Sequence, residues 1–325
     1  MVLLFWGIVF VVSLVVMVVG ADTFLKNAES IGLKMGLSAF TIGVIIVGFG
    51  TSLPEMVSGL VAVLEGAPSI VPANAIGSNI ANILLIGGVL AFLGKRIKVD
   101  RDLLEAELPF FVISTALFAE IAFDAQVTLV EALLLVCTFL VYVFYLFKEE
   151  YVSSAVVEQT EKELKRERYS LFRLSEVRTV LMLLVGLGGL LAGAKYVIDA
   201  VIVLAEMLRI PPSAISITAI ALGTSLPELV VSIHAVKSGK LSVAIGNIFG
   251  SNAFNITLAV GIPGIFMALP LDIPTFSIGL PVLLVSSFIF LVIGLAHRLH
   301  RWEGIMFFIL YAFFVMQLFT QCCNV

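Results

Sequence analysis

Charged residues are scarce in this chain of 325 residues: Asp, Glu, Lys and Arg make up 13% of it, whereas ordinary soluble domains carry about 25%. Hydrophobic residues make up 60% of the sequence. A soluble fold could not hide this much apolar surface from water. The composition therefore predicts an integral membrane protein.

Cysteine and histidine are also rare, with three of each. Cys322 and Cys323 are adjacent, and Cys137 lies inside an apolar run, so neither a disulfide framework nor a zinc site is expected. There is no excess of basic residues, and the net charge of −4 gives no reason to expect nucleic acid as a partner.

Long apolar runs fill most of the sequence, and a run of about 20 residues is enough for one membrane-spanning helix. Ten such runs, separated by short polar breaks, fall at residues 2–20, 37–64, 73–93, 103–121, 127–147, 177–205, 213–236, 241–269, 275–296 and 302–320. The first run is expected to belong to the fold, because no basic residue precedes it and no small-x-small cleavage signal ends it.

Lysine and arginine are sorted between these runs: seventeen of the nineteen lie in the odd-numbered connections. Basic residues collect on the cytoplasmic side, so both termini are expected outside the cytoplasm of a multi-pass protein of the cell membrane. The mixed-charge connection 148–176 is then a cytoplasmic linker, predicted as a solvated or membrane-surface helix between the halves 1–147 and 177–325.

The chain contains an internal repeat at a constant shift of 173 residues. Gly-Thr-Ser-Leu-Pro-Glu at 50–55 recurs at 223–228, and Gly-Ser-Asn-x-x-Asn at 77–82 recurs at 250–255. Asn74 and Asn247 obey the same shift. Five predicted spans separate matched points, and because five is odd the second copy enters the membrane from the opposite side. Such inverted repeats are typical of secondary transporters.

Glu55 and Glu228 lie within apolar stretches, where an ionisable side chain costs several kcal/mol unless it faces a cavity and has a partner. A structural alternative is a protonated glutamate that bonds a neighbouring helix. Two glutamates at matched positions in identical hexapeptides favour a functional site instead. Asp22 and Lys26, four residues apart, are expected to form a local ion pair, and His234 is expected near a membrane interface.

The hexapeptide has the features of a cation site. Its threonine and glutamate are four residues apart and share a helix face. Its proline cannot donate to the carbonyl of Gly50 or Gly223, so the helix is expected to break there and expose oxygens. Carboxylates, hydroxyls and carbonyls form an all-oxygen set that suits a hard cation such as calcium, and the absence of histidine and cysteine argues against zinc, copper or iron.

The second motif adds small residues that let helices approach closely and amide or hydroxyl oxygens that can complete a coordination shell. An isolated copy is as compatible with helix packing as with ion binding. Two copies, each 27 residues after a glutamate motif, favour a second wall of one central site.

These paired motifs resemble the sodium/calcium exchangers of the cation/calcium exchanger superfamily, in their compact prokaryotic form. The resemblance covers essentially the whole chain. It implies an all-α integral membrane protein, not an enzyme, with ten transmembrane helices in two inverted five-helix repeats and broken helices at a central ion site. Transported calcium and sodium are then bound as substrates with no cofactor, and beyond the ions and the lipid bilayer no obligatory protein partner is implied.

The resemblance also implies a set of ion ligands by matched position. Those for calcium are Glu55, Glu228, Thr51 and Thr224. Those for flanking sodium ions are Ser78, Ser251, Asn82, Asn255 and the carbonyls of Gly48 and Ala221. Many members carry an aspartate where this chain has Asn255, which leaves the ion ratio and any role of potassium open.

Two other functions stay open from the sequence. Glutamates in a membrane can also bind protons, so a proton-coupled calcium antiporter is the nearest alternative. A cation channel is a further alternative, and it would show flux without dependence on a counter-ion.

Overall fold

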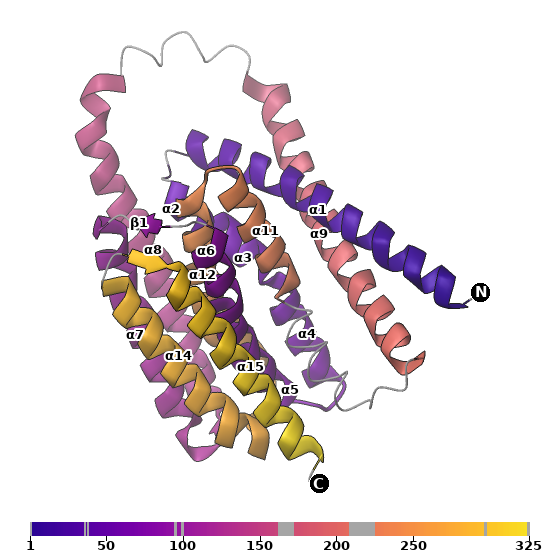
Figure 1. Ribbon diagram of the computed structural model, residues 1–325. Helices are drawn as coiled ribbons and strands as arrows, with labels where there is room; N and C mark the ends of the chain where they lie inside the picture. The colour runs from indigo at the N-terminus through magenta and orange to yellow at the C-terminus, as the bar shows by residue number, and fades with distance from the viewer. Residues whose placement is uncertain are drawn as a thin grey trace.

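The computed structural model describes residues 2–35, 37, 39–93, 96–98, 101–161, 172–207, 225–295 and 298–323. These residues form long helices joined by short connections (Figure 1). Two very short antiparallel strand pairs are the β-structure of the described part. The predicted all-helical class is confirmed.

The first half of the chain consists of helices that π-helical segments interrupt. Its elements are α1 (Val2–Lys34), α2 (Ala39–Thr41), η1 (Ile42–Gly48), α3 (Phe49–Thr51), α4 (Leu53–Leu64), α5 (Ile70–Ile80), η2 (Ala81–Ile86), α6 (Gly87–Leu93), β1 (Arg96–Lys98), α7 (Arg101–Ile121), η3 (Ala122–Asp124), β2 (Gln126–Val127) and α8 (Leu129–Glu161).

The second half follows the same plan. Its elements are α9 (Phe172–Met207), α11 (Leu226–Lys237), α12 (Leu241–Phe254), η4 (Asn255–Ala259), α13 (Val260–Phe266), β3 (Leu269–Pro270), η5 (Thr275–Gly279), α14 (Leu280–Leu295), β4 (Arg298–His300) and α15 (Arg301–Cys323).

Seven helical segments of the described residues are long and apolar enough to cross a membrane. They coincide with seven of the ten apolar runs. In the run 177–205 the apolar helix is shorter, Val177–Gly193, and the first half of the run 213–236 lies outside the described residues. The run 103–121 forms α7, whose first turns carry acidic residues.

The first helix is longer than the apolar run 2–20 predicts, because α1 continues to Lys34. Lys26 and Lys34, expected in the connection after the first span, are therefore helical. Side-chain bonds within the helix support this extension: Lys26 donates to Asp22 at 2.7 Å, and Asn27 Nδ2 donates to the carbonyl of Thr23 at 2.7 Å. Polar residues paired at this spacing stabilise a helix beyond its apolar part.

The repeated motifs lie on the most buried helices. In the most apolar stretch of Leu241–Phe266, 94% of the residues are buried, and in that of Ile70–Leu93 78% are. The corresponding value for Arg301–Leu318 is 17%. Figure 1 shows α5 and α12 in the middle of the bundle, with α7, α8, α14 and α15 on one side and α1 and α9 on the other. The outer helices carry large apolar side chains that are exposed on the protein surface, as expected of helices that face lipid.

Helices α1 and α9 pack along one another (Figure 1). Their backbones come close at glycines: a Cβ atom on Gly193 would lie 2.6 Å from the nitrogen of Met17, and one on Gly186 would lie 2.9 Å from Cα of Phe24. Small residues permit such close packing between membrane helices. Gly20 and Gly193, matched by the repeat, both lie at this contact.

The two strand pairs are related to each other by the internal repeat. In one, Ile97 pairs with Leu299 and Arg96 with His300; in the other, Gln126 pairs with Pro270 and Val127 with Leu269. If each residue of the second pair is replaced by the one 173 positions away in the other half, Gln126–Pro270 becomes Leu299–Ile97 and Val127–Leu269 becomes His300–Arg96. The two pairs lie at opposite ends of α7, because β1 precedes this helix of 21 residues and β2 follows it.

Candidate ion site

Both copies of the hexapeptide break their helix at the serine. Ser52 has φ −88° and ψ 3°, and Ser225 has φ −87° and ψ 1°, which lie outside the helical region. In the first copy α3 ends at Thr51 and α4 begins at Leu53, so the predicted break is confirmed there. Pro54 and Pro227 occupy the first turn of the following helix, where a missing N–H costs little.

The two glutamates lie in the first turns of α4 and α11 and are almost fully buried: Glu55 is 2% exposed and Glu228 1%. A helix N-terminus carries a partial positive charge and favours carboxylates. Ser52 donates a hydrogen bond to Oε1 of Glu228 at 2.9 Å, whereas Oε2 of Glu228 has no hydrogen-bond partner in the described part of the chain. The serine comes from the first repeat and the glutamate from the second.

Asn247 on α12 joins the site residues of both halves. Its Nδ2 atom donates to the carbonyl of Glu228 at 3.3 Å and to Oγ of Ser232 at 2.9 Å. Its Oδ1 atom accepts from Oγ1 of Thr51 at 3.3 Å and from Oγ of Ser251 at 3.4 Å. One amide thus fixes the threonine of one motif, the serine of another and the backbone that carries Glu228.

The carbonyl of Gly48 lies where η1 meets α12. It lies 3.2 Å from Oγ of Ser251 and 3.3 Å from Oγ1 of Thr51, so each hydroxyl shares its one proton among acceptors that include this carbonyl and Oδ1 of Asn247. A Cβ atom on Gly48 would lie 2.9 Å from the nitrogen of Ser251 and 3.0 Å from Cα of Gly250. The close helix approach expected from the Gly-Ser-Asn motif is therefore confirmed for its second copy.

Asn82 and Asn255 lie where α-helix gives way to π-helix. Asn82 belongs to η2 and Asn255 begins η4, and both side chains are fully buried. Neither amide has a hydrogen-bond partner within the residues described. Short π-helical segments are frequent at functional sites, and a buried amide without partners costs free energy that a bound ion or water would recover.

The structure brings several of the ligand candidates together. Gly48, Thr51, Ser251 and Glu228 are linked by the hydrogen bonds above. Glu55 is buried on α4, which packs against α5 and η4, and Ser78 is buried on α5. Thr224 and Ala221 lie outside the described residues.

Three pairs of residues near the site were not among the ligand candidates: Ser52 with Ser225, Asn74 with Asn247, and Asn79 with Asn252. Asn79 donates from Nδ2 to the carbonyl of Asn252 at 3.1 Å. All three pairs obey the shift of 173 residues and are buried. The shift already matches Asn74 with Asn247, and it would have identified the other two pairs if it had been applied to every polar residue of the motifs.

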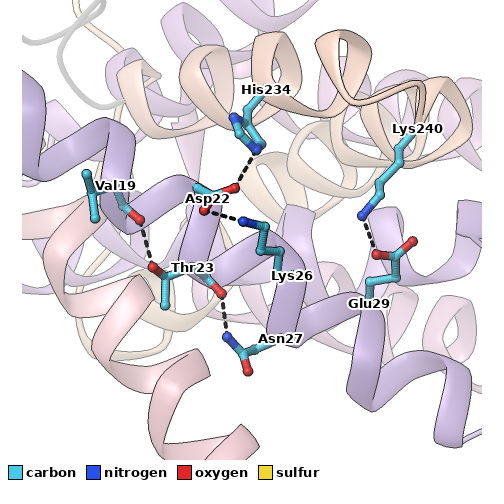
Figure 2. A network of polar contacts seen from close by, with 8 residues as sticks. All are labelled: Val19, Asp22, Thr23, Lys26, Asn27, Glu29, His234 and Lys240. Carbon is cyan, nitrogen blue, oxygen red and sulfur yellow. Dashed lines mark hydrogen bonds and ion pairs between the residues drawn. The ribbon is translucent and has the colours of Figure 1, made fainter.

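A separate polar network ties α1 to α11 and α12 (Figure 2). Asp22 contacts both Lys26, at 2.7 Å, and Nε2 of His234 on α11, at 2.9 Å. Lys240, directly before α12, forms an ion pair with Glu29. The predicted Asp22–Lys26 pair is confirmed, and His234 adds a second contact to it.

The chemistry of the central residues is that of a hard-cation site. Both glutamates are buried, and hydroxyl, amide and carbonyl groups of Ser52, Asn247 and Gly48 lie in the hydrogen-bonded network around Glu228. Cations of the calcium type take six to eight oxygen ligands of these kinds. The close contacts between η1 and α12 hold these groups on rigid elements, which is what selective binding requires.

Comparison with known proteins agrees with this geometry. The family model described as sodium/calcium exchanger protein matches residues 5–148 and again residues 178–320. The chain is 34% identical to the sodium/calcium exchanger MaX1 of Methanosarcina acetivorans, over 96% of this chain and 98% of that protein. It is 33% identical to the inner membrane protein YrbG of Escherichia coli, over 86% of each.

Solved structures give the same result. A structure of the sodium-calcium exchanger NCX_Mj, soaked with zero Na+ and Ca2+, superimposes with a TM-score of 0.82 and 29% identity over 97% of this chain and 99% of that one. A second, soaked with Na+ and Sr2+, gives a TM-score of 0.81 over 96% and 97%. The protein is thus a membrane-embedded secondary transporter and not an enzyme, and it belongs to the sodium/calcium exchanger family.

Proposed function

We propose that this protein is an antiporter that exchanges sodium for calcium at one central site. Two matched glutamates, Glu55 and Glu228, are buried at helix breaks among oxygen donors from both halves, and this observation carries the proposal. Together they supply a charge of −2, which one calcium ion neutralises. Sodium has a similar radius and half the charge, so two or more sodium ions are needed for comparable compensation. Competition for the same oxygens couples the two fluxes.

The proposed calcium ligands are the two glutamates and the threonines of their motifs. The proposed sodium ligands are the serines and final asparagines of the second motif and two backbone carbonyls. The full set is Glu55, Glu228, Thr51, Thr224, Ser78, Ser251, Asn82, Asn255, Gly48 and Ala221. Partnerless polar atoms support it, since Oε2 of Glu228 and the amides of Asn82 and Asn255 lack hydrogen bonds in the described part of the chain.

The proposed architecture is ten membrane helices in two inverted repeats, residues 1–147 and 177–325, joined by the linker 148–176. Three observations support it. The family model matches two segments that begin 173 residues apart, at 5 and 178. The two strand pairs share one register under the same shift, and they lie at opposite ends of α7. A twofold rotation that exchanges the two strand pairs also exchanges the two faces of the membrane. Transport by alternating access requires this relationship between repeats.

The proposed orientation follows from the basic residues. The linker and the connection after α11 are cytoplasmic, and both termini are extracytoplasmic. In this orientation the network of Figure 2 lies toward the cytoplasm, where Lys26, Lys237 and Lys240 gather. Exchange of more than two sodium ions for one calcium ion would be electrogenic, with about 2.3 kcal/mol per charge for each 100 mV of membrane potential.

A flux assay in proteoliposomes tests the function. The purified protein is reconstituted, and radioactive calcium uptake is measured with an outward sodium gradient, with a pH step and with an imposed voltage, each applied alone. We expect uptake that needs the sodium gradient at equal pH and saturates with calcium. Calcium uptake that does not depend on the sodium gradient but increases with the pH step would establish proton coupling. Calcium uptake that needs no counter-ion would establish a channel.

A further inference from the structure

The two halves of the site agree closely in backbone geometry. The serines at the helix breaks have the same φ and ψ to within 3°, and helices α4 and α11 begin and end at matched residues. The turns that follow both use a glycine with positive φ, 79° at Gly66 and 76° at Gly239. Differences in hydrogen bonding between matched residues therefore stand out against a symmetric backbone.

Asn79 and Asn252 are matched by the repeat, and they contact one another. Nδ2 of Asn79 donates to the carbonyl of Asn252 at 3.1 Å. Two residues related by a twofold axis that touch each other lie beside that axis, so the reverse bond, from Nδ2 of Asn252 to the carbonyl of Asn79, is its symmetry equivalent. In the described part of the chain Nδ2 of Asn252 has no partner, so one of the two equivalent bonds is formed.

A second matched pair has the same asymmetry. Ser52 donates to Oε1 of Glu228 at 2.9 Å. Its equivalent Ser225 is buried, and its Oγ atom has no hydrogen-bond partner among the residues described. In both pairs the residue of the first half donates to the second half. Both pairs are therefore asymmetric in the same direction within the described residues.

The carbonyl of Asn252 has a specific place in the site. It also accepts a bond from the backbone nitrogen of Asn255, at the point where α12 changes into the π-helical segment η4. The amide of Asn79 thus holds the end of α12 that presents Asn255, across the boundary between the two halves. Nδ2 and Oδ1 of Asn252 are buried without partners in the described chain, and a buried donor without an acceptor costs free energy.

We propose that Asn79 and Asn252 are positioning residues that alternate as hydrogen-bond donor during transport. In the state described here Asn79 holds the backbone of the second half. In the state that opens to the other side of the membrane Asn252 holds the backbone of the first half, and the bond from Asn79 is released. This proposal rests on the proposed function, because the exchange of donors requires two inverted repeats that exchange conformations during transport.

The test is hydrogen–deuterium exchange mass spectrometry of the full-length protein in lipid nanodiscs without transported ions. Exchange is compared between α4 and α11, whose residues match one to one. Asn79→Ala removes the bond of the present state and shifts the population toward the state that opens to the other side of the membrane. Asn252→Ala shifts it the opposite way. We expect the exchange difference between α4 and α11 to move in opposite directions in the two variants, with about a five-fold change in the ratio of states, equivalent to about 1 kcal/mol.

Two controls make the outcome decisive. Ser114→Ala removes a buried hydroxyl that bonds only its own helix, at the carbonyl of Phe111, and should leave the difference between α4 and α11 unchanged. If an alanine variant does not fold, leucine at the same position removes the donor while it keeps a branched side chain of similar shape. The proposal would be overturned if the exchange difference between α4 and α11 moved equally in the same direction in Asn79→Ala and Asn252→Ala. It would also be overturned if that difference changed no more than in Ser114→Ala.

Flux measurements give a second readout. The calcium concentration that gives half-maximal transport is measured in inside-out and in right-side-out membrane vesicles. The ratio of these two concentrations should change in opposite directions for Asn79→Ala and Asn252→Ala. A merely structural role would change both faces alike. If the unmodified protein shows no sodium-driven calcium uptake, the proposed function fails, whereas the hydrogen-exchange result still decides the role of the two asparagines.

Discussion

The hydroxyl of Ser52 donates a hydrogen bond to Oε1 of Glu228 at 2.9 Å, and the two residues belong to opposite halves of the chain. A hydrogen bond to a buried carboxylate contributes about 1.5–3 kcal/mol and fixes its rotamer. It holds one oxygen of Glu228 and leaves the other for a ligand. In the proposed site the carboxylate would thereby be positioned for a cation before the cation arrives, which reduces the cost of ordering on binding.

Ser52→Ala is therefore expected to weaken calcium binding about ten-fold, because the carboxylate loses its partner and its fixed orientation. Binding of radioactive calcium to the purified protein measures the change. Ser52→Thr keeps the hydroxyl and should retain most of the affinity. Unchanged affinity in Ser52→Ala would show that the bond does not prepare the site.

Replacement of either central carboxylate by its neutral amide is expected to abolish calcium-dependent transport. Glu55→Gln and Glu228→Gln each remove half of the negative charge that compensates a divalent ion. Both variants should stay folded, since a buried neutral group is easier to desolvate than a charged one. Flux in proteoliposomes and gel filtration in detergent measure the two effects.

The matched control is Glu65→Gln, which changes an exposed glutamate directly after the last turn of α4. Its transport should equal that of the unmodified protein. Retained calcium flux in both Glu55→Gln and Glu228→Gln would exclude the glutamates from the mechanism.

Much of the fold follows from local features of the sequence. The apolar runs predict where helices lie, because backbone groups in lipid must be satisfied within the helix. Pro54 predicts the break at Ser52, because the proline ring excludes a continuous helix. Helix ends are less well predicted. The extension of α1 to Lys34 depends on side-chain pairs such as Asp22 with Lys26 and on contacts with α11, which hydropathy alone does not reveal.

The hydrogen-bond partners at the site are not local features. Asn247 can bond both Thr51 and Ser251 only because η1 lies close to α12. Gly48 and Gly250 together set the distance between these two helical segments. The π-helical segments that carry Asn82 and Asn255 depend on one extra residue in a turn, which no sequence signal marks. The repeat identifies which residues are equivalent, but not which of them touch.

Asn255→Asp is expected to introduce a pH dependence into calcium affinity. The amide is fully buried, so an aspartate in its place is uncharged at low pH and gains a negative charge as pH rises. Because that charge attracts a divalent ion, calcium affinity should rise with pH more steeply than in the unmodified protein. Asn27→Asp, on α1 outside the site, controls for a change in net charge. Identical pH profiles for both variants would place Asn255 outside the site.

Gly250→Ala is expected to destabilise the protein and to reduce transport. A Cβ atom at this position would lie 2.8 Å from Cα of Val44, and backbone cannot move aside as a flexible side chain does. Overpacking of this kind costs about 1–3 kcal/mol, and it would also separate Ser251 from the carbonyl of Gly48.

Gly188→Ala is the matched control, because a Cβ atom on this helical glycine of α9 has no atom within 4 Å. Alanine is the better helix former by about 1 kcal/mol, so this variant should be as stable as the original or slightly more stable. Thermal unfolding in detergent, followed by circular dichroism, distinguishes the two. A Gly250→Ala protein with unchanged unfolding temperature and calcium affinity would show that the contact between η1 and α12 tolerates a methyl group, and that the site does not depend on this close approach.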